Sequence, residues 1–322
     1  MPSLKEIKTR IASVNNTRKI TSAMKMVASS KLHHAQMMIE NMLPYENMLE
    51  HILKSFLVSM PDAEVKLGMK RNHVKRVALI VFASNSSLCG GFNANVLKMM
   101  QQAVNDYKSQ GVDVIIYAIG RKVSEKVAKI GLKSAGDFME LADKPKAQQC
   151  QDIAHEIMLK FMSGDFDKVE MIYHHFKSAG SQILTRKTFL PIDLSTELDV
   201  DNDRDLSSNV ITAKAQEYLR KKKNNGRGQS SKEAIPLNDD FIVEPNLKEV
   251  LSSLVPKQLH LMFYTALLDS NASEHAARMV AMQTATDNAD EILRDLNLQY
   301  NKSRQQAITS ELLDIVGGSV NN

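Results

Sequence analysis

The stretch "VALIVFASNSSLCGGFNANV", from Val77 to Val96, sets the character of the middle of the chain. Its opening apolar run is typical of a strand that is covered on both faces. The pair Gly90-Gly91 predicts a tight turn, and we expect a helix to open at Asn93. Strand, glycine turn and helix is also the layout of a phosphate-binding loop, so a nucleotide site is the first hypothesis to test.

The sequence around this turn lacks three features that nucleotide sites require. A dinucleotide-binding fold needs G-x-G-x-x-G after its first strand, whereas this stretch offers only Gly90-Gly91. A Walker loop carries Lys and then Ser or Thr after its last glycines, and here Phe92 and Asn93 follow. A ribose-binding acid is expected where the second strand ends, and that strand ends at Gly120. We therefore expect no nucleotide and no other cofactor on this chain.

The rest of the middle section alternates between strand and helix patterns. Apolar runs predict strands at 76–83, 112–119, 169–176 and 182–190, the last two joined by a turn at 178–180. Helical periodicity predicts helices at 94–108, 122–130 and 146–161. This alternation indicates a compact α/β domain over residues 75–195.

A long helix is predicted at the beginning of the chain, over residues 1–60. Ser3 and Glu6 have the spacing of a capping box, which marks a helix start. Apolar residues then recur in alternating steps of three and four, beginning with Leu4 and Ile7, and this is the period of a coiled coil. A helix of about 55 residues would be roughly 80 Å long. Pro44 predicts a local kink in it.

A second long helix is predicted over residues 246–318. Pro256 falls near its beginning and is expected to separate a short helix from a long one. No proline or glycine then occurs from Lys257 to about Val316. Neither long helix can bury its apolar stripe alone, so we expect the two to pair as an antiparallel coiled coil. The predicted fold is therefore mixed α+β, with a Rossmann-like α/β domain inserted between the N- and C-terminal helices of a long coiled coil.

Residues 198–240 differ in composition from both the domain and the long helices. They are charged, rich in Gly, Asn and Ser, and poor in apolar residues. We interpret them as a solvated polar insertion, with disorder or a short helix at 211–223 as alternatives. The basic run Arg220–Lys223 is either solvated or a docking element.

Charge and composition exclude several classes of protein. The 322 residues suffice for about two domains, and the net charge of +4 is too small to argue for nucleic acid. Residues 1–34, however, hold seven basic residues against one acid, which favours an acidic partner or a solvated helix face.

Two cysteines give no disulfide framework and no zinc site, and a reducing compartment is expected. No apolar run approaches the roughly 20 residues that span a bilayer, and no secretion signal is predicted.

Residues that could form a catalytic or metal site are few. The pairs His33-His34 and His174-His175 are neighbours in sequence, and neighbouring side chains do not converge on one metal ion. Cys89 lies beside a predicted helix start, which can activate a thiol, but no His or Asp partner is visible. We expect no catalytic and no metal-binding residue, and a structural or contact role for Cys89.

Four segments, in the same order along the chain, resemble the gamma subunit of the F-type rotary ATP synthase. They are "ITSAMKMVASSKL" (20–32), "SSLCGGFN" (86–93), "SEHAARMVAMQTATDNADEI" (273–292) and "ITSELLDIVGGS" (308–319). The resemblance covers essentially the whole chain. It implies a non-catalytic rotor whose terminal helices turn as a shaft inside a hexamer of alpha and beta subunits. Ion-driven rotation of the ring of c subunits would then force the catalytic beta subunits through ATP synthesis.

The resemblance also implies which residues contact partners. Met24 and Lys25 match a rotor face near acidic lever loops of the beta subunits, and the turn at Cys89 matches one that faces the same levers. Polar residues toward the shaft tip, Arg304, Gln305 and Thr309, are expected to hydrogen-bond the catalytic subunits. The expected contacts with alpha and beta subunits are Met24, Lys25, Cys89, Arg304, Gln305 and Thr309.

The segment "FIVEP", residues 241–245, matches a foot that touches the c ring beside the epsilon subunit. Phe241, Val243 and Glu244 are its expected contact residues. Phe241 and Val243 stand where the family often has tyrosine. The contact role that the resemblance implies therefore carries over best to Glu244. Ser87 is a second departure, because the family has glycine there and serine would stiffen the loop. The insertion at 198–240 is longer than the family leads us to expect, and a regulatory or stabilising contact is our hypothesis for it.

Two other functions stay open at the level of sequence. A structural coiled-coil adaptor with an α/β head and no rotary role would form a stable homodimer. A small nucleotide-dependent enzyme would bind ATP or NAD as the isolated chain. The sequence favours the cytoplasmic face of a bacterial inner membrane, reached only through the c ring, although a mature mitochondrial or plastid chain would look the same.

Overall fold

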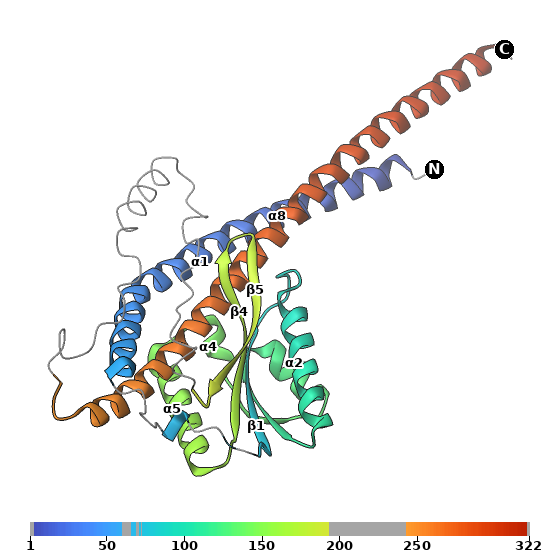
Figure 1. Cartoon of the computed structure of the whole chain (residues 1–322). Coiled ribbons are helices and arrows are strands. Elements are labelled where there is room, and N and C mark those ends of the chain that lie inside the picture. Colours follow the sequence, from blue (N-terminus) through green and yellow to red (C-terminus); the bar gives the residue numbers. More distant parts are fainter. Residues whose placement is uncertain (1–2, 60–65, 69–70, 72, 193–242, 321–322) are drawn as a thin grey trace. The chain divides into compact units, whose positions relative to one another are not determined.

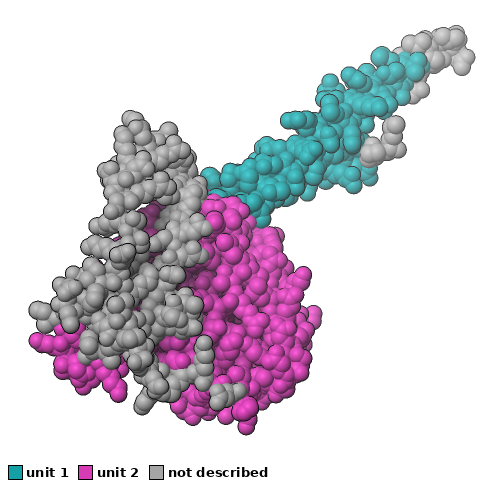
Figure 2. All heavy atoms as spheres, in the orientation of Figure 1, with its two compact units in different colours: residues 1–28, 278–322 teal, residues 29–277 magenta. Residues whose placement is uncertain are grey.

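The computed structural model describes residues 3–59, 66–68, 71, 73–192 and 243–320. The chain forms two compact units (Figure 2). Unit 1 consists of residues 1–28 and 278–322, and unit 2 consists of residues 29–277. The polar insertion at 198–240 and Phe241 lie outside the described residues.

Unit 2 is built on a five-stranded sheet in the order β3-β2-β1-β4-β5. The strands are β1 (Arg76–Phe82), β2 (Asp113–Ile119), β3 (Lys133–Asp137), β4 (Lys168–Ser178) and β5 (Ser181–Leu190). β1 to β4 run parallel to their neighbours, and β5 returns antiparallel to β4 as a hairpin. β1 is buried from Val77 to Phe82, as its continuous apolar run predicts for a central strand.

Helices cover both faces of this sheet (Figure 1). On one face, α2 (Phe92–Ser109) and α3 (Arg121–Lys129) pack on the apolar residues of β1 and β2 that include Val77, Leu79 and Val81. On the other face, α4 (Met139–Asp143) and α5 (Ala147–Ser163) share a core with the alternate strand residues and with parts of α1 and α8. Successive strand side chains point to opposite faces, so each central strand serves both cores.

The two long helices run antiparallel to each other in unit 1. These helices are α1 (Leu4–Ser59) and α8 (Leu247–Val320). Arg18 pairs with Asp290 at 2.9 Å, and the hydroxyls of Thr21 and Thr286 hydrogen-bond at 2.8 Å. Residue numbers thus fall along α8 as they rise along α1. Buried or half-buried positions recur at 4, 7, 11, 14, 18, 21, 25 and 28 on α1, and at 282, 286, 289, 293, 296, 300, 303 and 307 on α8.

These alternating steps of three and four confirm the predicted antiparallel coiled coil and the mixed α+β fold. The predicted break at Pro256 is wrong, because α8 continues through it as one helix. Leu251, Val255 and Leu259 flank the proline and are all buried in the same core, and their packing outweighs one lost hydrogen bond. α1 also continues as a helix through Pro44, and Figure 1 shows its axis turning in its lighter-blue second half.

The sequence patterns missed three short elements: the 3-10 turn η1 (Lys66–Gly68), β3 and α4. β3 has the sequence "KSAGD", and it is an edge strand without a buried residue. An edge strand needs no apolar run, so hydrophobic patterning cannot find it. Among the described residues, no helix is long and apolar enough to cross a membrane.

Candidate functional site

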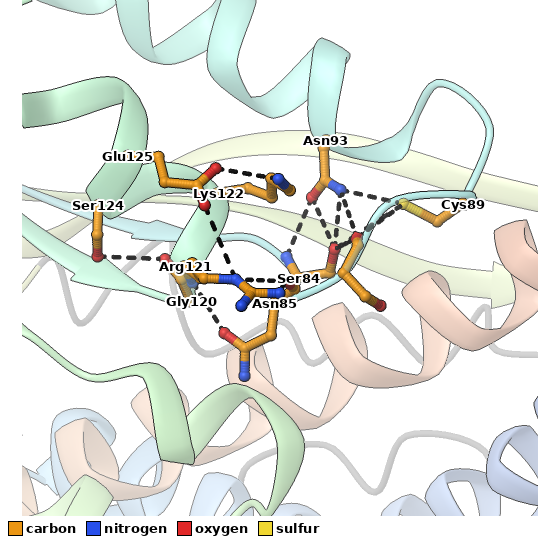
Figure 3. A network of polar contacts seen from close by, with 10 residues as sticks. Ser84, Asn85, Cys89, Asn93, Gly120, Arg121, Lys122, Ser124 and Glu125 are labelled. Atoms are coloured by element: carbon orange, nitrogen blue, oxygen red, sulfur yellow. Dashed lines mark hydrogen bonds and ion pairs between the residues drawn. The ribbon is translucent and has the colours of Figure 1, made fainter. Parts of the chain in front are cut away.

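The loop that follows β1 is held together by the side chain of Asn93 (Figure 3). The Asn93 side-chain oxygen accepts a hydrogen bond from the backbone N–H of Ser84 at 3.1 Å. Its amide nitrogen lies 2.8 Å from Ser84 Oγ, 3.1 Å from Cys89 Sγ and 3.2 Å from the Ser86 carbonyl oxygen. Ser84 Oγ in turn donates to the Ser86 carbonyl oxygen at 2.6 Å. One residue from the first turn of α2 therefore fixes both ends of the loop.

A second set of contacts ties this loop to the end of β2. The backbone N–H of Arg121 donates to the Asn85 side-chain oxygen at 2.8 Å, and its guanidinium donates twice to the Asn85 carbonyl oxygen. The Asn85 amide donates to the Met139 carbonyl oxygen at 2.7 Å. Gly120 makes this approach possible, because a Cβ there would lie 2.1 Å from the Ala83 carbonyl oxygen and its φ is +102°. Only glycine fits such a position.

At this loop the polar side chains of Ser84 and Asn93 make their contacts within the chain. The α2 N-terminus receives no side-chain cap, but the N–H of Phe92 bonds the Cys89 carbonyl oxygen at 3.2 Å. The Phe92 ring stacks on His174 of β4, with 4.4 Å between the ring centroids. In a doubly wound sheet, ligands bind outside the carboxyl ends of strands where the strand order reverses, here between β1 and β4. In this chain an aromatic pair fills that position.

Leu88 and Cys89 have opposite exposure in this loop. Cys89 is buried at 2% exposure, so its thiol faces inward against Asn93. Leu88 is 60% exposed and has a φ of +67°, and it is the only non-glycine residue with positive φ in the described part of the chain. Such a backbone conformation costs about 1–2 kcal/mol for a leucine. Sequence patterning did not single out Leu88, because neither exposure nor backbone angle can be read from periodicity.

The basic beginning of the chain forms an exposed surface on α1. Lys5, Lys8, Arg10, Lys19 and Lys31 are exposed. Arg18 is half-buried because it pairs with Asp290 across the coiled coil. The excess positive charge read from the sequence therefore lies mostly on solvent-facing positions, where it is available to an acidic partner.

Met24 and Lys25 are both half-buried on α1. Lys25 occupies a position of the three-four repeat, so its methylene stem can lie along α8 while its ammonium group reaches solvent. Arg304, Gln305 and Thr309 are all exposed on α8. The Thr309 hydroxyl donates to the Gln305 carbonyl oxygen at 2.9 Å, within its own helix. Gln305 and Thr309 are four residues apart and share one helix face.

The last turns of α8 extend beyond the beginning of α1. The paired positions 18 with 290 and 21 with 286 have residue numbers that add up to 308 and 307, so Arg304 lies opposite about residue 4, where α1 begins. Ile308, Leu312 and Leu313 follow and are 48%, 57% and 66% exposed. We name these three residues the apolar tip. The sequence showed them as "ITSELL", but only the register of the two helices shows that they lie beyond α1.

The expected foot is described only in part. Val243 is half-buried and packs against the core that α1, α5 and α8 share with the sheet, and Glu244 is exposed. The helix α8 begins directly afterwards, with Asn246 accepting a hydrogen bond from the N–H of Glu249 as an N-terminal cap. Glu244 is thus presented to solvent next to a well-defined helix start.

The charged cluster on the α2 side of the sheet consists of side chains that pair with one another. The buried carboxylate of Glu170 contacts Lys168 and Arg186 at 2.7 Å each and accepts a hydrogen bond from the Tyr107 hydroxyl. These partners hold the pKa of Glu170 below its usual value despite the opposing effect of burial.

Burial raises the pKa of the Cys150 thiol to about 12. Among the described residues, no group of three or more His, Cys, Asp or Glu side chains could hold a metal ion.

Known proteins match this chain over nearly its whole length. The family model described as ATP synthase matches residues 3–320. The chain is 53% identical to the ATP synthase gamma chain of Phocaeicola vulgatus and 50% identical to that of Bacteroides thetaiotaomicron. Each alignment spans 321 residues and covers 99% of this chain and 100% of the relative.

Solved structures share the fold at lower sequence identity. A chain of the Euglena gracilis mitochondrial ATP synthase, in a structure of OSCP, F1 and c-ring, matches with a TM-score of 0.59 and 16% identity over 99% of this chain and 94% of that chain. A chain from the central stalk and c-ring of the Tetrahymena thermophila enzyme matches with a TM-score of 0.52 and 24% identity over 83% of this chain and 99% of that chain. The sequence matches carry the identification: this chain belongs to the ATP synthase gamma chain family.

Proposed function

We propose that this chain is the central-stalk rotor of an ATP synthase and couples rotation of a c ring to ATP synthesis on neighbouring beta subunits. The observation that carries this proposal is the antiparallel pair of α1 and α8, which ends in an apolar tip on a single helix. Ile308, Leu312 and Leu313 are all exposed in the chain by itself, and neighbouring exposed apolar residues favour a protein partner. Inside a protein bore, the same residues would be covered.

The proposed contacts with alpha and beta subunits divide into two groups. Met24 and Lys25 would lie against acidic loops, because a flexible thioether and a basic group attract without fixing one geometry. Arg304, Gln305 and Thr309 are exposed near the tip, and we propose that they hydrogen-bond the catalytic subunits. Cys89 would act through the loop that it anchors, because its own side chain is buried.

The remaining proposals concern the other end of the complex. We propose that 1–60 and 246–318 serve as the shaft helices and 75–195 as the globular domain. Phe241, Val243 and Glu244 would meet the c ring and the epsilon subunit, so membrane contact is indirect. The chain would then be a non-catalytic, peripheral subunit on the cytoplasmic face of a bacterial inner membrane. For the insertion, deletion of residues 202–235 tests a regulatory role, and unchanged ATP hydrolysis, coupling and assembly would exclude it.

Reconstitution tests the rotor proposal directly. Alpha and beta subunits are mixed with and without this chain, and ATP hydrolysis is measured. We expect activity to depend on the chain. The double substitution Arg304→Ala, Gln305→Ala should lower turnover, because it removes the guanidinium and amide donors near the tip. The matched control Arg294→Ala, Gln299→Ala removes the same groups from exposed positions farther from the tip. Equal activity with and without the chain would exclude the rotor role.

A further inference from the structure

The helix α8 contacts the sheet of unit 2 through two kinds of surface. Along its first part the contacts are aromatic and aliphatic. Phe263 lies with its ring centroid 5.6 Å from that of Phe82 and 6.2 Å from that of Phe189, and Leu259 and Leu267 are buried beside it. Apolar contacts of this kind stabilise without direction. They do not by themselves fix the rotation of a helix about its own axis.

The next turns of α8 carry buried polar groups. Asp269 is 1% exposed, and its carboxylate lies 2.7 Å from His175 Nδ1 of β4. The fully buried Ser273 hydroxyl donates to the His174 carbonyl oxygen at 3.2 Å. Asn271 donates its amide to the Ala142 carbonyl oxygen of α4 at 2.8 Å. We name these three contacts the polar clamp.

The polar clamp holds α8 from two sides. Asp269 and Ser273 are four residues apart, so they lie on one face of the helix, toward β4. Asn271 is two residues from each of them, a rotation of about 200°, and it points to the opposite side, toward α4. Each contact is directional and requires its own partner within hydrogen-bond distance. Turning α8 about its axis would break contacts on both sides at once.

The polar clamp is located where α8 leaves unit 2. Unit 2 ends at Ala277, four residues after Ser273, and the same helix continues as part of unit 1. Buried polar contacts contribute little net stability compared with apolar residues of the same shape, but they specify register. Their position at the end of unit 2 is therefore suited to fixing the rotation of α8 about its own axis relative to the sheet.

We propose that His175, Asp269, Asn271 and Ser273 are positioning residues that lock the rotation of α8 to the α/β domain, so that torque passes between the domain and the shaft. This inference rests on the proposed rotor function. It assigns to the polar clamp torsional stiffness as its main role, with little share in folding stability.

The double substitution His175→Leu, Asp269→Leu tests this role by removing both members of the 2.7 Å contact together. Leucine matches histidine in volume but is larger than aspartate, so the free energy of unfolding in urea is measured alongside, and coupling is compared among chains that fold. The variant is assembled into the whole complex in lipid vesicles, and ATP hydrolysis and the ATP-driven membrane potential are measured together. In stalled complexes, the angular fluctuation of a probe on the α/β domain reports torsional stiffness. We expect unchanged hydrolysis, a loss of membrane potential per ATP hydrolysed, and larger fluctuations.

Two further variants control this result. His175→Asn places an amide nitrogen where Nδ1 lies, and it should restore coupling and stiffness. Arg71→Leu, Asp167→Leu removes a 2.8 Å ion pair of unit 2 and the hydrogen bonds of Asp167 to the backbone N–H groups of Lys75 and Arg76. None of these contacts involves α8, so coupling and stiffness should stay at the wild-type level. Wild-type coupling and stiffness in the double leucine variant, or equal losses in the Arg71 and Asp167 control, would overturn the proposal.

A variant that is less perturbing covers the case in which the double leucine chain does not assemble. Ser273→Ala removes one polar-clamp contact and leaves no buried charge. Larger angular fluctuations in this variant support the polar clamp, and wild-type fluctuations count against it. If instead the wild-type chain fails to activate alpha and beta subunits, the rotor function itself is wrong.

Discussion

At the scale of single residues, His174 is a buried group whose protonation makes the stability of the chain depend on pH. Its ring is 3% exposed against Phe92, and burial lowers its pKa from the usual 6.5 to about 4. The folded chain therefore keeps His174 neutral, whereas the unfolded chain binds a proton below pH 6.5. Its contribution to stability is complete above pH 6.5 and is lost as the pH falls toward 4, by at most about 3 kcal/mol.

The substitution His174→Phe tests this pH dependence, because phenylalanine keeps the ring stack and removes the titrating group. We expect the free energy of unfolding, measured in urea at several pH values, to fall less between pH 6.5 and 4 than in the wild-type chain. At pH 7 the two chains should be similar. His33→Phe, at an exposed position of α1, serves as the control. Parallel pH profiles for His174→Phe and the wild type would show that another group is responsible.

At the scale of elements, the loop between β1 and α2 depends on one amide. Asn93→Ala would leave Ser84 and the Ser86 carbonyl oxygen without this partner, at a cost of about 1–3 kcal/mol. The loop should open, and Cys89 should react faster with a thiol reagent. Cys150 is an internal reference, because its buried thiol has a raised pKa. Asn95→Ala, at an exposed position of the same helix, should change neither rate. An unchanged Cys89 rate in Asn93→Ala would mean that the backbone alone holds the loop.

The elements also show how far sequence patterns reach. The strands and helices with strong apolar periodicity were predicted close to their observed bounds, as for 112–119 against β2 (Asp113–Ile119). The α8 helix continued through Pro256 because tertiary packing outweighed a local breaker. In the loop, the glycine turn was predicted from sequence, but the burial of Cys89 and the exposure of Leu88 follow from side-chain contacts across the fold. The polar clamp pairs residues 94 to 129 positions apart, and no local pattern encodes such a pairing.

At the scale of the whole molecule, the distribution of charge predicts how the chain finds its partners. The net charge is only +4, yet residues 1–34 alone carry an excess of +6. Exposed charges act over about 10 Å at 0.1 M salt and mainly raise association rates. If α1 meets an acidic bore, assembly should slow as salt is raised, and Lys19→Gln, Lys31→Gln should weaken that salt dependence. The rate at which ATP hydrolysis appears after mixing with alpha and beta subunits measures this effect. Lys98→Gln, Lys129→Gln neutralises two exposed lysines on α2 and α3 instead. The same salt dependence in both double variants would show that the charge on α1 does not guide assembly, because net charge alone would then account for the rates.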